Sequence, residues 1–115
     1  MAAESASPME LVIMLYDGAI RFLGESREAS GKGDRRGRAK GISKALAIIA
    51  ELQSTLNMDD GAEVARELDR LYTYASERLL DASVKRDDSA IDEVRKLLGT
   101  VRAGWADIGL ARAAV

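Results

Sequence analysis

The sequence predicts an all-α fold, an antiparallel up-down four-helix bundle, and three observations support this prediction. Apolar residues recur at three- and four-residue spacing in four long stretches, which is the period of an amphipathic helix. The Gly- and Asp-rich segments between the stretches are too short to let consecutive helices run parallel, so each helix should be antiparallel to the next. No stretch alternates apolar and polar residues as a half-buried strand does. With 115 residues, the chain is expected to form a single helical domain over residues 1–115, of which residues 1–6 are expected to be disordered.

The first helix is predicted from Pro8 to about Ser30. Ser7 and Glu10 have the spacing of a capping box, and Pro8 stands at the first helical position, where no hydrogen bond needs its missing N–H. The glycines of segment 31–34 end the helix.

The second helix is predicted from Arg35 to Leu56. Its start lies among Gly31, Gly33, Gly37 and Gly41, so we expect that end to be frayed.

The third and fourth helices each follow a pair of aspartates. Asp59 or Asp60 is expected to cap the third helix, and Asp87 or Asp88 the fourth. The apolar stripe of the third helix consists of Val64, Leu68, Leu71, Tyr72, Ala75, Leu79 and Ala82. The inward-facing residues of the fourth are Ile91, Val94, Leu97, Leu98, Val101, Trp105 and Ile108.

The composition excludes the commonest catalytic and metal-binding chemistry. The chain has no His and no Cys, so it has no imidazole or thiolate ligand, no serine-histidine triad and no cysteine nucleophile. Aspartate pairs stand at helix starts, where capping already explains them. We therefore predict no catalytic residue, no metal site and no cofactor. The longest strongly apolar run, residues 11–16, is too short to span a membrane, and the start lacks a basic signal region, which predicts a cytoplasmic protein.

The first helix carries more apolar surface than a core-facing helix needs. Val12, Tyr16, Ala19, Ile20 and Leu23 form one stripe, and Leu11, Leu15 and Phe22 form a second stripe beside it. Two interpretations stay open. The helix contacts both neighbours and the diagonal helix, or part of the second stripe is a surface for another chain, either a partner or a second copy in a structural homodimer.

The segment 32–44 is the strongest charge feature, with Asp34 as its only acid. Its cations are Lys32, Arg35, Arg36, Arg38, Lys40 and Lys44. Clustered cations predict phosphate contacts, so a small nucleic-acid-binding or regulatory helical protein is one alternative function. No aromatic side chain lies nearby in the sequence for base stacking, and the net charge of −2 gives no overall attraction to nucleic acid or membranes. We expect neither as a partner.

Four blocks of sequence, in order, resemble the flagellar export chaperone family FliS. They are SPMEL and MLYDGAI within residues 7–20, the apolar pattern and exit of the second helix over residues 42–59, residues 65–79 with LYTY, and residues 91–105. No block is diagnostic alone, but together they cover about residues 5–108, nearly the whole chain.

The resemblance implies a helical bundle that performs no catalysis and binds the C-terminal segment of flagellin in the cytoplasm. The chaperone would prevent premature polymerisation and assist delivery to the flagellar type III export apparatus, where export-gate components are further expected partners. The client segment, disordered when free, would wrap around a monomer or weak homodimer at one client per chaperone. We expect client contacts along the flank between the second and third helices, plus one tyrosine of the first. The predicted contact residues are Tyr16, Ile48, Leu52, Thr55, Leu71, Tyr74 and Arg78, of which Arg78 would pair with a client carboxylate.

Overall fold

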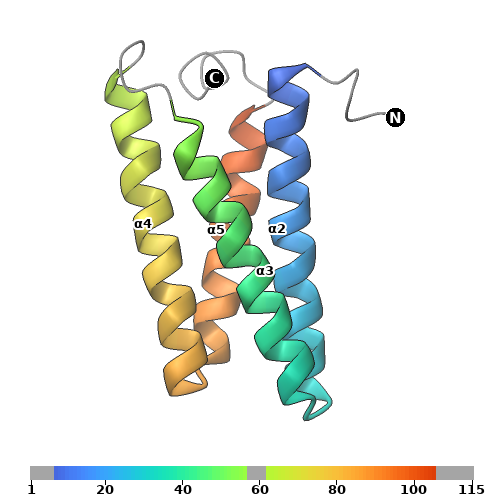
Figure 1. Ribbon diagram of the computed structural model, residues 1–115. Helices are drawn as coiled ribbons and strands as arrows, with labels where there is room; N and C mark the ends of the chain where they lie inside the picture. Colours follow the sequence, from blue (N-terminus) through green and yellow to red (C-terminus); the bar gives the residue numbers. More distant parts are fainter. Residues whose placement is uncertain (1–6, 57–61, 106–115) are drawn as a thin grey trace.

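The computed structural model describes residues 7–56 and 62–105, and in these residues it contains four α-helices and no strand. The helices are α2 (Pro8–Gly31), α3 (Arg35–Ser54), α4 (Ala62–Lys85) and α5 (Asp88–Trp105). They run alternately up and down (Figure 1), so the predicted four-helix bundle is confirmed. The predicted cap residues Asp59 and Asp60, and the inward-facing Ile108, lie outside the described residues.

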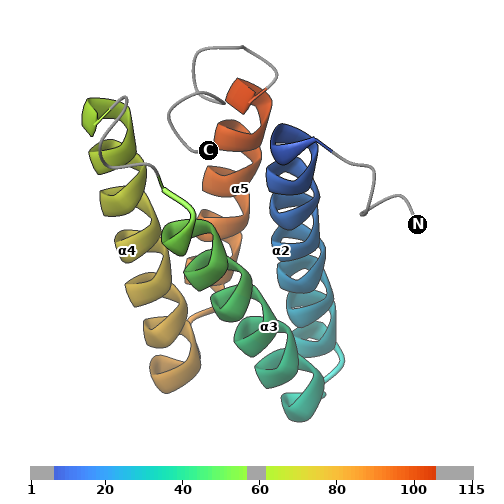
Figure 2. The same cartoon turned by 45° about the horizontal axis from the view of Figure 1, so that its top comes forward.

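The helices form a ring in the order α2, α3, α4, α5. Each helix packs against its two neighbours in this ring, and the α2–α3 contact is the most extensive. Figure 2, which brings the upper end forward, shows the same order. The outer surface between α2 and α3 therefore lies on the opposite side of the bundle from the surface between α4 and α5.

Local signals set most of the described helix ends where the sequence predicts them. The capping box of α2 is present, with Glu10 N donating to Ser7 Oγ and Ser7 N donating to Glu10 Oε1, both at 3.2 Å. At the start of α5, Ser89 N donates to Asp87 Oδ1 at 3.0 Å. Helix α3 ends at Ser54, two residues earlier than predicted, and the hydroxyl of Thr55 donates to the Leu52 carbonyl there.

The frayed start predicted for α3 is wrong. Asp34 caps the helix by accepting a hydrogen bond from Gly37 N at 3.0 Å. Gly41 is buried against α2, where a Cβ atom would lie only 2.6 Å from the carbonyl oxygen of Phe22. The Ser26 hydroxyl, also buried, donates to the Arg38 carbonyl at 2.7 Å. The glycine that sequence reasoning treats as a weakness thus allows the two backbones to approach closely.

An aromatic cluster joins the diagonal helices α2 and α4 through the core. The hydroxyls of Tyr16 and Tyr72 are 2.5 Å apart, and the ring of Trp105 from α5 lies 6.0 Å from that of Tyr16. Burial raises the pKa of both phenols, and the Tyr16 hydroxyl raises that of Tyr72 further. Both tyrosines are therefore neutral in the folded protein at physiological pH.

Candidate functional site

Large apolar side chains are exposed at the beginning of α2 and along α4. Such side chains are informative when they line a hollow together, because single exposed ones are common. Those with more than a third of their area exposed are Met9, Leu11, Met14, Tyr74, Leu80 and Val84.

The first hollow lies between α2 and α3 and has a volume of about 500 Å³. Its lining residues are Pro8, Leu11, Val12, Met14, Leu15, Glu51 and Thr55. Leu11, Leu15, Gly18 and Phe22 follow one another on the same face of α2, because their spacing of three or four residues is that of a helix face. We call this surface, with Ile48 and Thr55 from α3, the α2/α3 groove.

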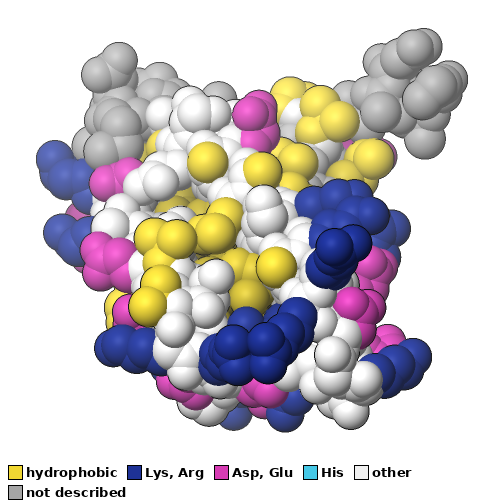
Figure 3. All heavy atoms as spheres, turned by 60° about the horizontal axis from the view of Figure 1, so that its bottom comes forward, with side chains coloured by type: hydrophobic (Ala, Val, Ile, Leu, Met, Phe, Trp, Pro, Cys, Tyr) yellow, Lys and Arg dark blue, Asp and Glu magenta, His cyan; other side chains and the backbone are white. Residues whose placement is uncertain are grey.

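The α2/α3 groove is the second apolar stripe that the sequence of the first helix predicts. Leu11 is 39% exposed, and Leu15 and Phe22 pack against the core but are only half-buried, so part of the stripe stays at the surface. Gly18 leaves the middle of the groove without a side chain, and Ile48 Cδ1 lies 3.3 Å from where its Cβ would be. In Figure 3, apolar atoms gather at the upper right of the face, with Lys and Arg side chains below them.

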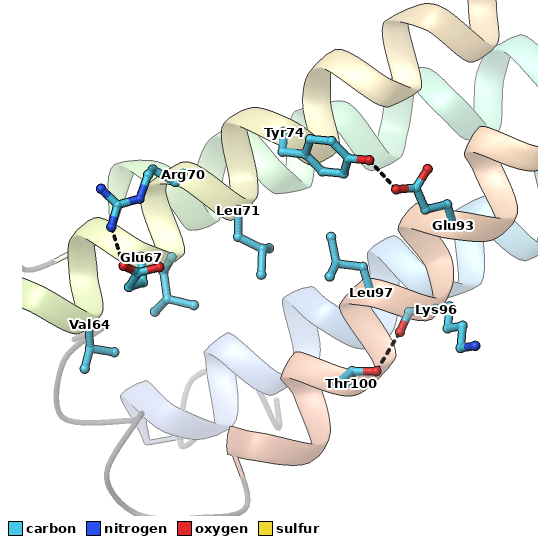
Figure 4. A pocket seen from close by; sticks show the side chains of 10 residues that line it. Val64, Glu67, Arg70, Leu71, Tyr74, Glu93, Lys96, Leu97 and Thr100 are labelled. Atoms are coloured by element: carbon cyan, nitrogen blue, oxygen red, sulfur yellow. Dashed lines mark hydrogen bonds and ion pairs between the residues drawn. The ribbon is translucent and has the colours of Figure 1, made fainter.

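The second hollow lies between α4 and α5 and has a volume of about 680 Å³. Figure 4 shows Leu71 and Leu97 pointing into it, with Val64 at one end and Tyr74 at the other. The Tyr74 hydroxyl donates to Glu93, and these two side chains close the hollow at that end. We call this surface the α4/α5 hollow.

The charges beside the α4/α5 hollow are already paired. Arg78 Nε donates to Glu93 Oε1 at 2.8 Å, and its guanidinium also lies 3.8 Å from Asp87. The hydrogen bonds from Tyr74 and then from Arg78 hold the pKa of the Glu93 carboxyl below its ordinary value of 4.5. Arg78 therefore serves an internal ion pair in this structure, and its predicted pairing with a client would have to replace Glu93.

Two of the seven predicted contact residues do not lie on the surface. Tyr16 and Leu52 are 0% and 1% exposed, since both are at the centre of the apolar stripes of their helices. We remove them from the candidate site.

The predicted flank between the second and third helices is also wrong. Ile48 and Thr55 lie on the α2 side of α3, in the α2/α3 groove. Leu71 and Tyr74 lie on the α5 side of α4, in the α4/α5 hollow. The structure thus divides the predicted set between two opposite faces of the bundle.

Sequence reasoning missed Met14 and Leu97 as candidate surface residues. Met14 is 48% exposed and lines the α2/α3 groove. Leu97 lines the α4/α5 hollow, although periodicity assigned it to the core. The position of Met14, beside Leu11 and Leu15 on the helix surface, is a signal that could have found it.

Polar contacts bridge the other two faces. Between α2 and α5, Arg102 Nε donates to Asp17 Oδ1 at 2.6 Å, and Arg27 Nε donates to Asp92 Oδ1 at 3.0 Å. Between α3 and α4, the Gln53 amide donates to the Asp69 carboxylate at 2.8 Å.

One member of the basic segment has a structural role. Arg38 Nε donates to Asp88 Oδ1 at 2.9 Å, and its Nη2 donates to the Ala82 carbonyl at 2.8 Å, so it ties α3 to α4 and α5. Its guanidinium is thus engaged within the bundle, while Lys40 and Lys44 stay exposed.

The chemistry available to this arrangement is apolar binding. Within residues 7–56 and 62–105, no group of three or more acidic side chains is placed to hold a metal ion. None of the described helices is both long and apolar enough to cross a lipid bilayer. Apolar grooves between helices are the usual docking sites of amphipathic segments. The fold and its two surfaces define a helical-bundle binding protein.

Comparison with known proteins identifies the family. The family model described as flagellar protein FliS matches residues 1–112. The flagellar secretion chaperone FliS of Salmonella typhimurium is 39% identical over 108 residues, which cover 93% of this chain and 80% of that protein. The flagellar secretion chaperone FliSB of Pseudomonas aeruginosa is 37% identical over 103 residues, covering 90% and 82%. This chain belongs to the FliS family, and the resemblance inferred from its sequence is confirmed.

Proposed function

We propose that this protein is a cytoplasmic flagellar export chaperone that binds the disordered C-terminal segment of flagellin and performs no catalysis. Bound chaperone prevents flagellin from polymerising early and assists its delivery to the type III export apparatus, where export-gate components are further partners. Family membership supports the chaperone role, because the relatives described above are named as flagellar secretion chaperones.

The proposed binding of flagellin is supported by the two apolar surfaces on opposite faces of the bundle. A folded client would cover one face, whereas an extended segment that folds on binding reaches both. The α2/α3 groove and the α4/α5 hollow are each lined by apolar side chains of two adjacent helices, as docking sites for short amphipathic helices are. Such a client gives up part of its interaction energy to ordering, which keeps the complex reversible without ATP.

Calorimetric titration with a peptide from the C-terminal region of the cognate flagellin tests the proposal. We expect binding at micromolar or lower concentration, one peptide per chain, with a negative heat-capacity change from apolar burial. A bundle that is folded by circular dichroism and does not bind at micromolar concentration would refute the proposal.

Variants separate the two surfaces. Leu11→Asp in the α2/α3 groove and Leu71→Asp in the α4/α5 hollow should each weaken binding, because each places a charge in an apolar contact. Leu80→Asp is the matched control, since Leu80 is 54% exposed and lines neither surface. Equal losses in all three variants would mean that the surfaces are not the binding site. Leu11 is preferred to Ile48, whose side chain packs against Gly18 and contributes to the fold.

A further inference from the structure

The two ends of the α2/α3 groove differ in charge. At the lower end, Phe22 lies beneath two cations, with Arg21 Cζ 4.8 Å and Lys44 Nζ 5.0 Å from its ring centroid. Lys40 and Lys44 also line a small hollow beside Phe22. At the upper end, Glu51 lines the groove between the apolar side chains of α2 and Thr55.

The acids at the lower end are already engaged, so its positive charge is not cancelled. Glu25 lies 3.7 Å from Arg21, and the Asp34 carboxylate accepts the hydrogen bond that caps α3. Among the residues that the structure describes, no carboxylate lies within ion-pair distance of Lys40 or Lys44.

The separation of these charges matches the length of a short helix. Lys40 and Glu51 are eleven residues apart on α3, or about 16 Å at the rise of an α-helix. Leu11 and Phe22, which bound the apolar part of the groove on α2, are separated by the same number of residues. A helix of about three turns would thus cover the apolar surface and place its two ends beside the two charged regions.

We infer that the α2/α3 groove binds an amphipathic helical segment of a partner chain in one orientation. The C-terminal end of that helix, with acidic side chains, lies over Lys40 and Lys44, and its N-terminal end lies beside Glu51. A helix has partial negative charge at its C-terminus and partial positive charge at its N-terminus, so this orientation is electrostatically favourable at both ends. The apolar face of the helix packs on Leu15 and Phe22, and Gly18 lets it approach closely between them.

This inference rests on the proposed function only for the source of the helix, the C-terminal region of flagellin. The orientation follows from the charges of the groove and can fail while the proposed function holds. A second copy of this chain would be a different occupant, and sedimentation of the free protein distinguishes it. A dimer that Leu11→Asp dissociates would overturn the inference.

Paramagnetic labels at the two ends of α3 read the orientation directly. The chain has no Cys, so Arg36→Cys and Ser54→Cys each give one labelling position. These positions are eighteen residues apart, five helical turns, so they lie on the same face of α3 about 27 Å from each other. Both are exposed and lie outside the apolar lining of the groove.

The probe is an isotope-labelled peptide from the C-terminal region of the cognate flagellin, observed by NMR in complex with each labelled variant. We expect the label at Arg36→Cys to broaden the C-terminal end of a bound helix, and the label at Ser54→Cys to broaden its N-terminal end. The reverse pattern overturns the orientation. A bound peptide that neither label broadens has bound elsewhere, which overturns the inference but leaves the proposed function. A peptide that does not bind refutes the proposed function itself.

Charge reversal provides an independent check. The double variant Lys40→Glu/Lys44→Glu should weaken peptide binding roughly five- to tenfold, since each favourable charge at a helix end is worth about two- to fivefold. The double variant Arg66→Glu/Lys85→Glu is the control, because it reverses two exposed cations of α4 that line neither surface. It should change affinity less than about twofold, since exposed charges away from a binding surface act on it only through screened long-range interactions. Equal effects of the double variant and the control would show that only net charge matters and would overturn the inference.

Discussion

Gly41→Ala tests the close approach of α2 and α3, because the structure gives the geometry of the perturbation. The added Cβ would lie 2.6 Å from the Phe22 carbonyl oxygen and 2.6 Å from Ser26 Cβ. Ordinary contact begins at 3.4 Å, so the two helices would have to separate by about 0.8 Å at this level. The obstructing oxygen belongs to the backbone and cannot rotate away.

The expected cost combines three effects. Overpacking of a tight contact costs about 1–3 kcal/mol, and a strained Ser26 hydrogen bond to the Arg38 carbonyl costs up to about 1 kcal/mol more. Replacing glycine by alanine inside a helix returns about 1 kcal/mol. We therefore expect Gly41→Ala to lower the free energy of unfolding by up to about 3 kcal/mol.

Gly99→Ala is the matched control, because a Cβ atom there meets nothing within 4 Å. It should raise the free energy of unfolding by about 0.5–1 kcal/mol through helix propensity alone. Urea denaturation followed by circular dichroism measures both changes, provided that the slope with denaturant stays constant. If Gly41→Ala were as stable as Gly99→Ala, the close approach of α2 and α3 would not limit the size of residue 41.

Three further predictions follow from buried and paired groups. Tyr72→Phe should lower the free energy of unfolding, measured by urea denaturation, by about 0.5–1.5 kcal/mol. Tyr16→Phe should cost less in the Tyr72→Phe background than in the original protein, because the Tyr16 hydroxyl has then already lost its partner; additive costs would contradict the hydroxyl pair. Burial raises the pKa of both phenols, so their contribution to the free energy of unfolding is fully present below pH 10.0 and should be lost as the pH rises above it. The double variant Tyr16→Phe/Tyr72→Phe should remove much of that loss in urea denaturation at alkaline pH. Hydrogen bonds from Ser30 and then Arg38, together with the charges of Arg38 and Arg27, hold the pKa of Asp88 below 3.8. The contribution of Asp88 to stability is therefore present above that pH and is lost as the pH falls further. Asp88→Asn should flatten the acid branch of a stability profile, and an unchanged profile would contradict this assignment.

The sequence predicts the helices well because their signals are local. The capping box at Ser7 and the aspartate at Asp87 act within one helical turn, and the apolar spacing of α5 identifies its buried stripe. The early end of α3 at Ser54 is a small error, and hydroxyl contacts of that kind are weak signals in a sequence.

The candidate site was less predictable because it depends on which neighbour flanks each helix. Periodicity gives the angle between a residue and the centre of the apolar stripe, but not whether that side faces α2 or α4. Ile48 and Leu71 are therefore predicted on a shared flank, although the structure places them on opposite faces of the bundle. The packing role of Gly41 is missed for a related reason, because it depends on the backbone of α2, which the sequence around Gly41 does not show.

The aromatic cluster has a consequence for spectroscopy. The only Trp of the chain, Trp105, is fully buried beside Tyr16, whose hydroxyl pairs with that of Tyr72. Tyr74, the remaining tyrosine, lies at the α4/α5 hollow. Tryptophan emission therefore reports the contact between α2, α4 and α5 and should shift when the bundle melts. A ligand in the α2/α3 groove would leave that emission unchanged, so the native fluorophore separates loss of fold from occupancy of the surface without any added dye.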